Sequence, residues 1–203
     1  MKKKILIFGK NSFIGSNLYT FLKNKHIVKI ISFNSKSLIN LNKFDYVINC
    51  SINKNYINKP YSKNYDFDFK IVNKLNKNTH FIFFSSRKIY KPKANIYERS
   101  KVRCLNNYEK NKFITEKKIL KIKGNRSIIL RVSNIIGFKK YNPRKIHHTY
   151  LDYLINKIKK RELILNHNEY KDFLDINTFS KIINLIIKKK VFGIYNISMG
   201  KKV

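Results

Sequence analysis

Two tyrosine–lysine pairs in this chain have a spacing that suits proton transfer. Tyr97 precedes Lys101 by four residues, and Tyr108 precedes Lys112 by the same interval. Residues four apart lie on one face of a helix, so each phenol would lie near an ammonium group. A phenol ordinarily loses its proton at about pH 10, but a neighbouring cation favours the phenolate. Either pair could therefore take a proton from a substrate hydroxyl or return one to a ketone.

The residues around the two pairs favour the second. Helix-period spacing covers Tyr108–Lys121 and leads into an apolar strand, Ile128–Val132. Tyr97 and Lys101 lie instead in a stretch that predicts a loop. Because the chain is rich in lysine and has 13 tyrosines, at least one of the two matches is expected to arise by chance.

A glycine turn near the N-terminus has the features of a phosphate-binding site. The apolar run Ile5–Phe8 enters Gly9, and helix-like spacing begins at Ile14, one residue before Gly15. Glycine allows a close approach of the backbone to phosphates, and the first N–H groups of a helix attract anions. Ser12 stands where a third glycine would complete the pattern, so an ordinary strand–turn–helix connection is the alternative. The candidate cofactor-binding residues of this turn are Gly9, Asn11, Ser12, Phe13, Ile14 and Gly15.

Strand-like and helix-like segments alternate along the chain. The predicted strands are Ile5–Phe8, Val28–Phe33, Tyr46–Cys50, Phe81–Phe84, Ile128–Val132 and Ile194–Ile197. The predicted helices are Ile14–Lys23, Phe69–Leu75, Tyr108–Lys121, Thr149–Lys159 and Phe179–Lys188. This alternation predicts an α/β fold, a Rossmann-type doubly wound parallel sheet, in a single domain that spans residues 1–203. The stretch 137–168 interrupts the alternation, so we expect substrate-lobe insertions across residues 138–175.

Several short motifs resemble, in this order, those of one enzyme family. They are Phe13-Ile14-Gly15-Ser16, Ser85-Ser86-Arg87-Lys88-Ile89-Tyr90 and Leu130-Arg131-Val132-Ser133-Asn134-Ile135-Ile136-Gly137. These words are similar to motifs of the extended short-chain dehydrogenase/reductase family, the NAD-dependent sugar epimerases, dehydratases and reductases. Two further stretches, 45–51 and 171–176, extend the resemblance nearly from end to end.

The resemblance implies a role for several residues. The family has a catalytic Y-x-x-x-K pair about as far from its catalytic serine as Tyr108 is from Ser86, 22 residues. Tyr97 is only 11 residues from Ser86, and only the second pair is followed by a glutamate, Glu116, at the family's usual place. The catalytic residues implied are therefore Ser86, Tyr108 and Lys112. Ser86 would orient the sugar oxygen, and Asn134 would face the sugar nucleotide.

The cofactor implied by the resemblance is NADP or NAD. An acidic residue at the end of the second strand would bind the ribose hydroxyls of NAD, but no carboxylate is present there. A hydroxyl and a lysine better accommodate the 2′-phosphate of NADP, unless this loop points elsewhere. The candidate residues of this region are Ser32, Asn34, Ser35 and Lys36, and those of the adenosine side are Cys50 and Ser51.

The type of reaction follows from departures within the resemblance. Arg87 and Lys88 stand where dehydratases of the family carry acidic residues, which argues against dehydration. The stretch 33–45 is too short for the family's usual third strand. This shortening is similar to that of the dTDP-4-dehydrorhamnose reductase branch of the family. We therefore expect an NAD(P)-dependent oxidoreductase that reduces a nucleotide-linked 4-keto sugar by Tyr/Lys-assisted hydride transfer. The alternatives are a nucleotide-sugar epimerase and a non-catalytic Rossmann-like cofactor-binding protein.

The C-terminus bears on the last of these alternatives. The chain ends at Val203, where members of the family continue for some tens of residues. Either the sequence is cut short at this point, or the small C-terminal substrate lobe is incomplete, which would favour a protein that keeps the cofactor turn without turnover.

The formal net charge of +34 carries less information than its size suggests. The lysines are spread along the whole chain among asparagines and isoleucines, which indicates a compositional bias rather than a nucleic-acid face. No apolar run approaches the roughly 18 residues of a membrane span. Cys50 and Cys104 have no metal-ligand spacing and are expected to be free thiols in a reducing cytoplasm. We thus expect a cytoplasmic protein with a nucleotide-sugar substrate, no nucleic-acid or membrane partner and no metal. The sequence is compatible with a homodimer but does not predict one.

Overall fold

The computed structural model describes residues 1–34, 39–91, 93, 95–138, 150–162 and 171–200. Within them, six parallel strands form one sheet in the order β2-β1-β3-β4-β5-β8. These strands are β1 (Lys4–Phe8), β2 (Ile27–Ile31), β3 (Tyr46–Asn49), β4 (His80–Ser86), β5 (Ile128–Val132) and β8 (Gly193–Ile197). The chain runs from β1 outward to β2 and then crosses back to β3 on the other side of β1. Such a reversal is the place where open parallel sheets bind ligands, beyond the carboxyl ends of the strands.

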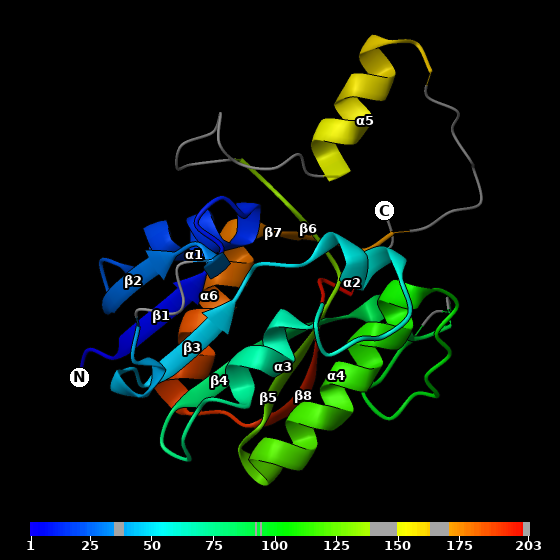
Figure 1. Cartoon of the computed structure of the whole chain (residues 1–203). Coiled ribbons are helices and arrows are strands. Elements are labelled where there is room, and N and C mark those ends of the chain that lie inside the picture. Colours follow the sequence, from blue (N-terminus) through cyan, green and yellow to red (C-terminus); the bar gives the residue numbers. More distant parts are fainter. Residues whose placement is uncertain (35–38, 92, 94, 139–149, 163–170, 201–203) are drawn as a thin grey trace.

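Helices cover both faces of this sheet (Figure 1). Helices α1 (Phe13–Leu22) and α6 (Ile176–Lys189) pack on one face, and α3 (Phe67–Val72) and α4 (Asn107–Lys123) pack on the other. The short helix α2 (Lys54–Asn58) packs against α4. The predicted α/β fold with a doubly wound parallel sheet is confirmed.

The central strand β1 shows why the sequence pattern was readable. Ile5 and Ile7 belong to the apolar cluster under α1 and α6, whereas Leu6 and Phe8 belong to the cluster under α3 and α4. All four side chains are completely buried. A strand that is covered on both faces has apolar residues at every position, and such a continuous run is easily recognised.

The end of β2 differs from the prediction. We expected the strand to reach Phe33, but it ends at Ile31, whose carbonyl oxygen accepts the N–H groups of Gly9 and Lys10. Phe33 then turns inward and stacks on Phe67, with 3.6 Å between the ring centroids. Burial of this ring draws the chain away from the strand direction. The described residues between Ile31 and Tyr46 contain no strand, as the shortness of this segment predicted.

Side-chain caps also shift two helix starts. Asp66 accepts the N–H of Phe69, so α3 begins at Phe67, two residues before the predicted start. The helix ends at Val72, three residues before the predicted end. Asp175 accepts the N–H of Thr178, so α6 begins three residues before the predicted Phe179. Capping residues satisfy N–H groups that lack a partner within the helix, which fixes where a helix begins.

A second, two-stranded sheet was not predicted. It pairs β6 (Asn134–Ile136) with β7 (Phe173–Asp175) in parallel, and three-residue strands are too short to show a period. Helix α5 (Tyr150–Lys159) lies between these strands in sequence, and Figure 1 shows it apart from the helices that cover the main sheet. The assignment of residues 138–175 to a substrate lobe remains a prediction. Across the described ranges, none of the helices combines the length and apolarity needed to cross a membrane.

Candidate functional site

The glycine turn after β1 brings two backbone segments into close contact. Gly9 has φ +110°, a conformation that L side chains rarely adopt, and its carbonyl oxygen accepts the N–H of Ser12. A Cβ on Gly15 would lie 2.5 Å from the carbonyl oxygen of Gly9, so no side chain fits there. Glycine is therefore needed at position 9 for its dihedral angles and at position 15 for the approach of α1 to the turn.

Ser12, which departs from a three-glycine pattern, caps α1. Its hydroxyl accepts the N–H of Gly15 at 3.4 Å. Helix α1 begins at Phe13, directly after Ser12. The half-buried Phe13 and Ile14 thus supply the first N–H groups of the helix, and Asn11 is exposed beside them. A helix start that follows a glycine turn is suited to a pyrophosphate.

Cys50, which follows β3, packs against the glycine turn. Its N–H donates to the carbonyl oxygen of Phe8 at 2.8 Å, and its Cβ lies 3.2 Å from the place a Cβ on Gly15 would occupy. Burial, and secondly the carboxylate of Asp68, raises the pKa of the Cys50 thiol, which is therefore neutral. The N–H of Ser51 donates to the side chain of Asn49. Gly9, Gly15 and Cys50 thus meet at the switch point between β1 and β3.

The region predicted to choose between NAD and NADP is described only in part. Ser32 and Asn34 are exposed after β2, on either side of the buried Phe33. Ser35 and Lys36 lie outside the described residues.

Helix α4 carries the second tyrosine–lysine pair. A capping box fixes its start, because Asn106 accepts the N–H of Glu109 while Glu109 accepts the N–H of Asn106. Tyr108 is half-buried in the first turn, and Lys112 follows one turn later. The predicted helical placement of this pair agrees with the structure.

Lys112 connects α4 to the carboxyl end of β4. Its ammonium group donates to the carbonyl oxygen of Phe84 at 2.8 Å, two residues before Ser86. Ser86 is buried and caps the short 3₁₀ turn Arg87–Ile89, since its Oγ accepts the N–H of Lys88 at 3.2 Å. The structure thus brings Lys112 and Ser86 to the same strand end. Burial, followed by the carboxylates of Asp66 and Asp68, raises the pKa of Tyr56 of α2.

The preceding serine, Ser85, belongs to a structural network. Its hydroxyl donates to Glu116, which also forms a buried ion pair with Arg131 at 2.7 Å. Arg131 in turn donates to the hydroxyl of Tyr90 and to the carbonyl oxygen of Glu98. Ser85 is therefore held by the packing of α4 on β4 and β5, which leaves Ser86 as the serine nearer the site.

The first tyrosine–lysine pair lies elsewhere. Tyr97 is 67% exposed in a turn that is closed by two hydrogen bonds with Ser100, and Lys101 is exposed as well. These two residues lie outside the helices, so they do not share a helical face. The expectation that the first copy lies in a loop agrees with this placement.

Asn134, the predicted substrate contact, is the first residue of β6. Its side-chain amide donates to the carbonyl oxygen of Asp172 at 3.0 Å, and the carboxylate of Asp172 accepts the N–H groups of Met199 and Gly200. Both residues thus connect β6, β7 and the segment after β8. The role of Asn134 toward a substrate remains a prediction.

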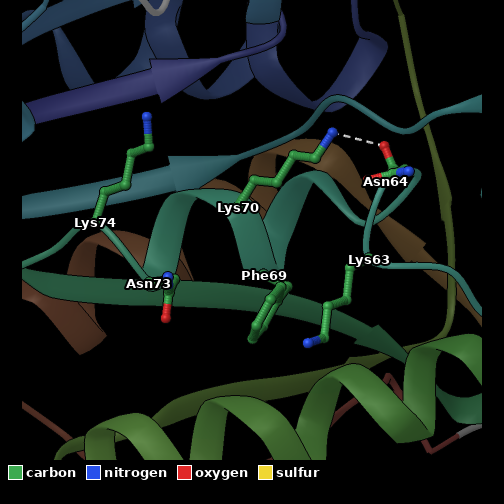
Figure 2. A pocket seen from close by; sticks show the side chains of 6 residues that line it. All are labelled: Lys63, Asn64, Phe69, Lys70, Asn73 and Lys74. Atoms are coloured by element: carbon green, nitrogen blue, oxygen red, sulfur yellow. Dashed lines mark hydrogen bonds between the residues drawn. The ribbon is translucent and has the colours of Figure 1, made fainter.

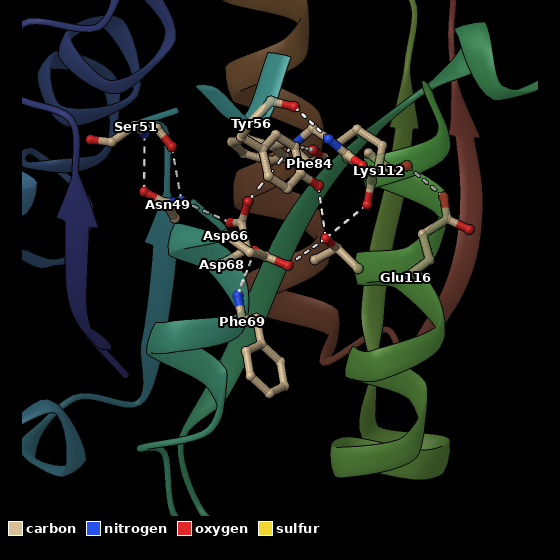
Figure 3. Close-up of polar contacts among 12 residues, drawn as sticks. Asn49, Ser51, Tyr56, Asp66, Asp68, Phe69, Phe84, Lys112 and Glu116 are labelled. Carbon is tan, nitrogen blue, oxygen red and sulfur yellow. Dashed lines mark hydrogen bonds and ion pairs between the residues drawn. The ribbon is translucent and has the colours of Figure 1, made fainter. Parts of the chain in front are cut away.

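Sequence reasoning missed a group of buried polar residues beneath Lys112, drawn in Figure 3. It contains Asn49 of β3, Tyr56 of α2, Asp66 and Asp68 at the start of α3, and Thr115 of α4. The sequence held one signal, since Asp66 and Asp68 precede a helix-like run as capping residues do. Which residues those carboxylates meet depends on contacts between helices far apart in sequence.

Two hollows in the described part of the chain are lined by other residues. A hollow of about 350 Å³ beside α3 is lined by Lys63, Asn64, Phe69, Lys70, Asn73 and Lys74 (Figure 2), and this lining includes none of the predicted site residues that the structure describes. A smaller one of about 220 Å³ lies beside Phe8, the residue before Gly9, with Ile39 and Leu41 on its wall. Among the described residues, no cluster of His, Cys, Asp and Glu could hold a metal ion, and both cysteines are free.

Comparisons with known proteins identify the family of this chain and proteins of similar fold. Residues 5–198 match the profile of the NAD dependent epimerase/dehydratase family. The fold is similar to that of UDP-N-acetylglucosamine 4-epimerase from Methanobrevibacter ruminantium M1, solved in complex with UDP-N-acetylmuramic acid. That comparison has a TM-score of 0.76 at 21% identity and covers 100% of this chain and 79% of the other.

Two further solved structures are similar. dTDP-4-dehydrorhamnose reductase from Yersinia enterocolitica has a TM-score of 0.77 at 18% identity, with 100% of this chain and 76% of the other covered. The enzyme WbmG from Bordetella bronchiseptica, in complex with NAD, has a TM-score of 0.75 at 17% identity and coverage of 100% and 74%. At these identities the likeness concerns the fold. A comparison with curated proteins finds no match.

Proposed function

Because the chain belongs to the NAD dependent epimerase/dehydratase family, we propose that it reduces a nucleotide-linked 4-keto sugar with an NAD(P)H cofactor. In this proposal Tyr108 is the acid that gives a proton to the ketone oxygen. Lys112 supports the phenolate and holds the cofactor ribose, and Ser86 orients the ketone oxygen.

The observation that carries the proposal is the position of Lys112. Its ammonium group lies at the carboxyl end of β4, bound to the carbonyl oxygen of Phe84, with Ser86 two residues farther along the strand. Tyr108 is one helical turn away on α4. The carboxyl ends of the strands are where ligands of such sheets bind, so all three groups belong to the expected edge.

The turn between β1 and α1 fits a dinucleotide. A Cβ at Gly15 would collide with the carbonyl oxygen of Gly9, so the close approach of α1 is built into the backbone. The N-terminus of α1 attracts a pyrophosphate through its dipole and its first N–H groups. Since Lys36 follows β2 and no carboxylate is present there, we propose that NADPH is preferred over NADH.

Each residue has a defined task in the reduction. When bound, the nicotinamide supplies the hydride, which adds to the ketone carbon. Tyr108 gives its proton to the ketone oxygen, so a hydroxyl forms and the phenolate remains until solvent returns the proton. The cation of Lys112 stabilises that phenolate. The hydroxyl of Ser86 donates a hydrogen bond to the same oxygen and fixes its direction.

An epimerase is the second candidate function. The motif that contains Asn134 and Gly137 is equally similar to that of 4-epimerases, and one neighbour in fold is a UDP-N-acetylglucosamine 4-epimerase. The short connection between β2 and β3, which lacks a strand in its described part, favours the reductase instead.

A substrate panel tests the proposal. The protein is incubated with UDP-, dTDP- and GDP-linked sugars and 4-keto sugars, with NADPH, NADH or NAD, and with a Tyr108→Phe variant as control. Reduction consumes the absorbance of NADPH and forms a 4-hydroxy sugar, and the control should not. An isomerised sugar without net change of the cofactor would establish the epimerase. Retention of the cofactor with no turnover of any sugar would establish a binding protein.

A further inference from the structure

The ammonium group of Lys112 has a buried carboxylate as its ion-pair partner. Asp68, on α3, has an oxygen 3.7 Å from Lys112 Nζ, and each side chain is only 8% exposed (Figure 3). The same ammonium donates to the carbonyl oxygen of Phe84 and lies 4.6 Å from the ring centre of Phe83. Lys112 is thus held between α3 and β4 rather than extended into solvent.

Asp68 is itself fixed by the end of β3. The amide of Asn49 donates to Asp68 Oδ1 at 2.8 Å and to the carbonyl oxygen of Ser51 at 3.0 Å. The Oδ1 of Asn49 accepts the N–H of Ser51. One asparagine therefore links the carboxylate to the backbone that follows β3, beside the glycine turn.

A lysine at this place needs such a partner. Its four-carbon stem is flexible, and an ammonium group that leaves water without a counter-ion is costly. A hydrogen bond to one carbonyl oxygen fixes a single donor and leaves the charge uncompensated. The carboxylate of Asp68 supplies the opposite charge and a second contact that fixes the position of the ammonium group.

We propose that Asp68 is a positioning residue for Lys112. It holds the ammonium group at the carboxyl end of β4, where Lys112 can contact the cofactor ribose and support Tyr108. This inference rests on the proposed function for the part that concerns the cofactor. The ion pair itself can be tested without a cofactor.

The groups around Asp68 come from four elements. Lys112 belongs to α4, Cys50 follows β3, Tyr56 belongs to α2 and Asp66 precedes α3. Burial raises the pKa of Asp68 to about 6, and the charge of Asp66 adds to this, whereas Lys112 and the hydrogen bond from Asn49 lower it. The carboxylate that faces Lys112 therefore gains a proton in mildly acidic solution.

Asp66 provides a matched control on the same segment. Its carboxylate caps α3 through the N–H of Phe69 and accepts the hydroxyls of Tyr61 and Thr115. These contacts hold α3 against α4. Loss of Asp66 should thus perturb packing without removing the counter-ion of Lys112.

The first experiment measures urea unfolding of wild-type protein, Asp68→Asn, Lys112→Met and the double variant. Lys112→Met leaves a buried carboxylate without its partner, so it should lower the urea midpoint. If the pair interacts, the same substitution should lower the midpoint less in the Asp68→Asn background. Equal shifts in both backgrounds would overturn the pairing.

The second experiment measures NADPH affinity for the same four proteins and for Asp66→Asn at pH 7 to 8. Asp68→Asn should weaken binding about tenfold, the loss expected when one hydrogen bond to a charged group is misplaced. In the Lys112→Met background it should cause no further loss, whereas Asp66→Asn should stay within about threefold of wild type. With NADH, which has no 2′-phosphate to gain a proton near pH 6, binding should weaken in wild type on acidification through about pH 6, because Asp68 gains a proton, and remain level in Asp68→Asn.

Failure of the positioning role of Asp68 and failure of the proposed function give different results. Losses that add up in the double variant would show that Asp68 acts through the fold and would overturn the positioning role. If wild-type protein binds neither NADPH nor NADH, the proposed function fails, and the urea experiment alone decides whether Asp68 fixes Lys112.

Discussion

A Cβ atom on Gly15 would lie 2.5 Å from the carbonyl oxygen of Gly9, a separation that real Cβ atoms do not show. The first turn of α1 therefore approaches the end of β1 as closely as the backbone permits. The glycine turn, which we propose binds the cofactor, depends on this contact, because any side chain at position 15 would push α1 and its N–H groups away from the turn.

Gly15→Val should abolish NADPH and NADH binding. The added side chain displaces the start of α1, which we propose binds the pyrophosphate. Isothermal titration measures the affinity, and circular dichroism verifies that the variant is folded. Asn24→Val is the control: it introduces the same side chain at an exposed position after the end of α1 and should keep the affinity. A folded Gly15→Val protein with unchanged affinity would disprove the assignment of this turn.

Tyr108→Phe should lower turnover about 10²–10⁴-fold, the contribution of a positioned acid or base. The ring is kept, so the fold and cofactor affinity should survive. Lys112→Met should reduce both turnover and cofactor affinity, because it removes the cation and the ribose contact. Steady-state rates with the substrate identified by the panel measure these effects.

Tyr97→Phe is the matched control for the tyrosine. Tyr97 is 67% exposed in a surface turn, so its variant should keep the wild-type rate. If Tyr97→Phe loses activity and Tyr108→Phe does not, the first pair is the catalytic one.

Lys36→Glu should weaken NADPH binding more than NADH binding. The prediction comes from the sequence, since Lys36 lies outside the described residues and follows β2, where a cation would meet the 2′-phosphate. Affinities for both cofactors measure it, with Lys77→Glu as a control of equal charge change on the exposed loop before β4. Equal losses for NADPH and NADH would show that Lys36 does not contact the 2′-phosphate.

Glu116→Gln should lower the free energy of unfolding by about 3–5 kcal/mol, because Arg131 then remains buried without a counter-ion. The two groups form an ion pair of 2.7 Å with almost no exposure. Urea denaturation measures the change. Glu162→Gln removes the partner of Lys157 in an exposed pair and should leave the midpoint unchanged. Similar stability of the Glu116 variant and wild type would show that the buried pair contributes little.

Asp68 should make stability depend on pH in a defined direction. Burial raises its pKa from 3.8 to about 6, so the folded protein binds this proton more tightly than the unfolded chain does. The resulting stabilisation is complete below the unfolded pKa and is lost as pH rises through about 6. The free energy of unfolding of wild type minus that of Asp68→Asn should therefore fall between about pH 4 and about pH 7. A difference that is constant with pH would contradict the raised pKa.

The sequence by itself determined the central sheet and the strand, glycine turn and helix at the N-terminus, and it placed Tyr108 and Lys112 on one helix and Tyr97 in a loop. Strand β1 is covered on both faces, so Ile5–Phe8 form an unbroken apolar run that stands out from the helices. Tyr108 and Lys112 belong to a single helix, and spacing along a helix is a local property. The family motifs are local as well, since each consists of neighbouring residues.

Only the tertiary structure decided which buried polar groups meet. Asp68 of α3 pairs with Lys112 of α4, 44 residues away. Glu116 of α4 pairs with Arg131 of β5. The inward turn of Phe33 depends on Phe67, which is 34 residues farther along the chain. Nothing in the spacing of these residues encodes their meeting, because charged and aromatic partners are selected by the packing of helices on the sheet. Burial makes the stability of the fold depend on the two ion pairs, since a charge removed from water needs a counter-ion within the fold.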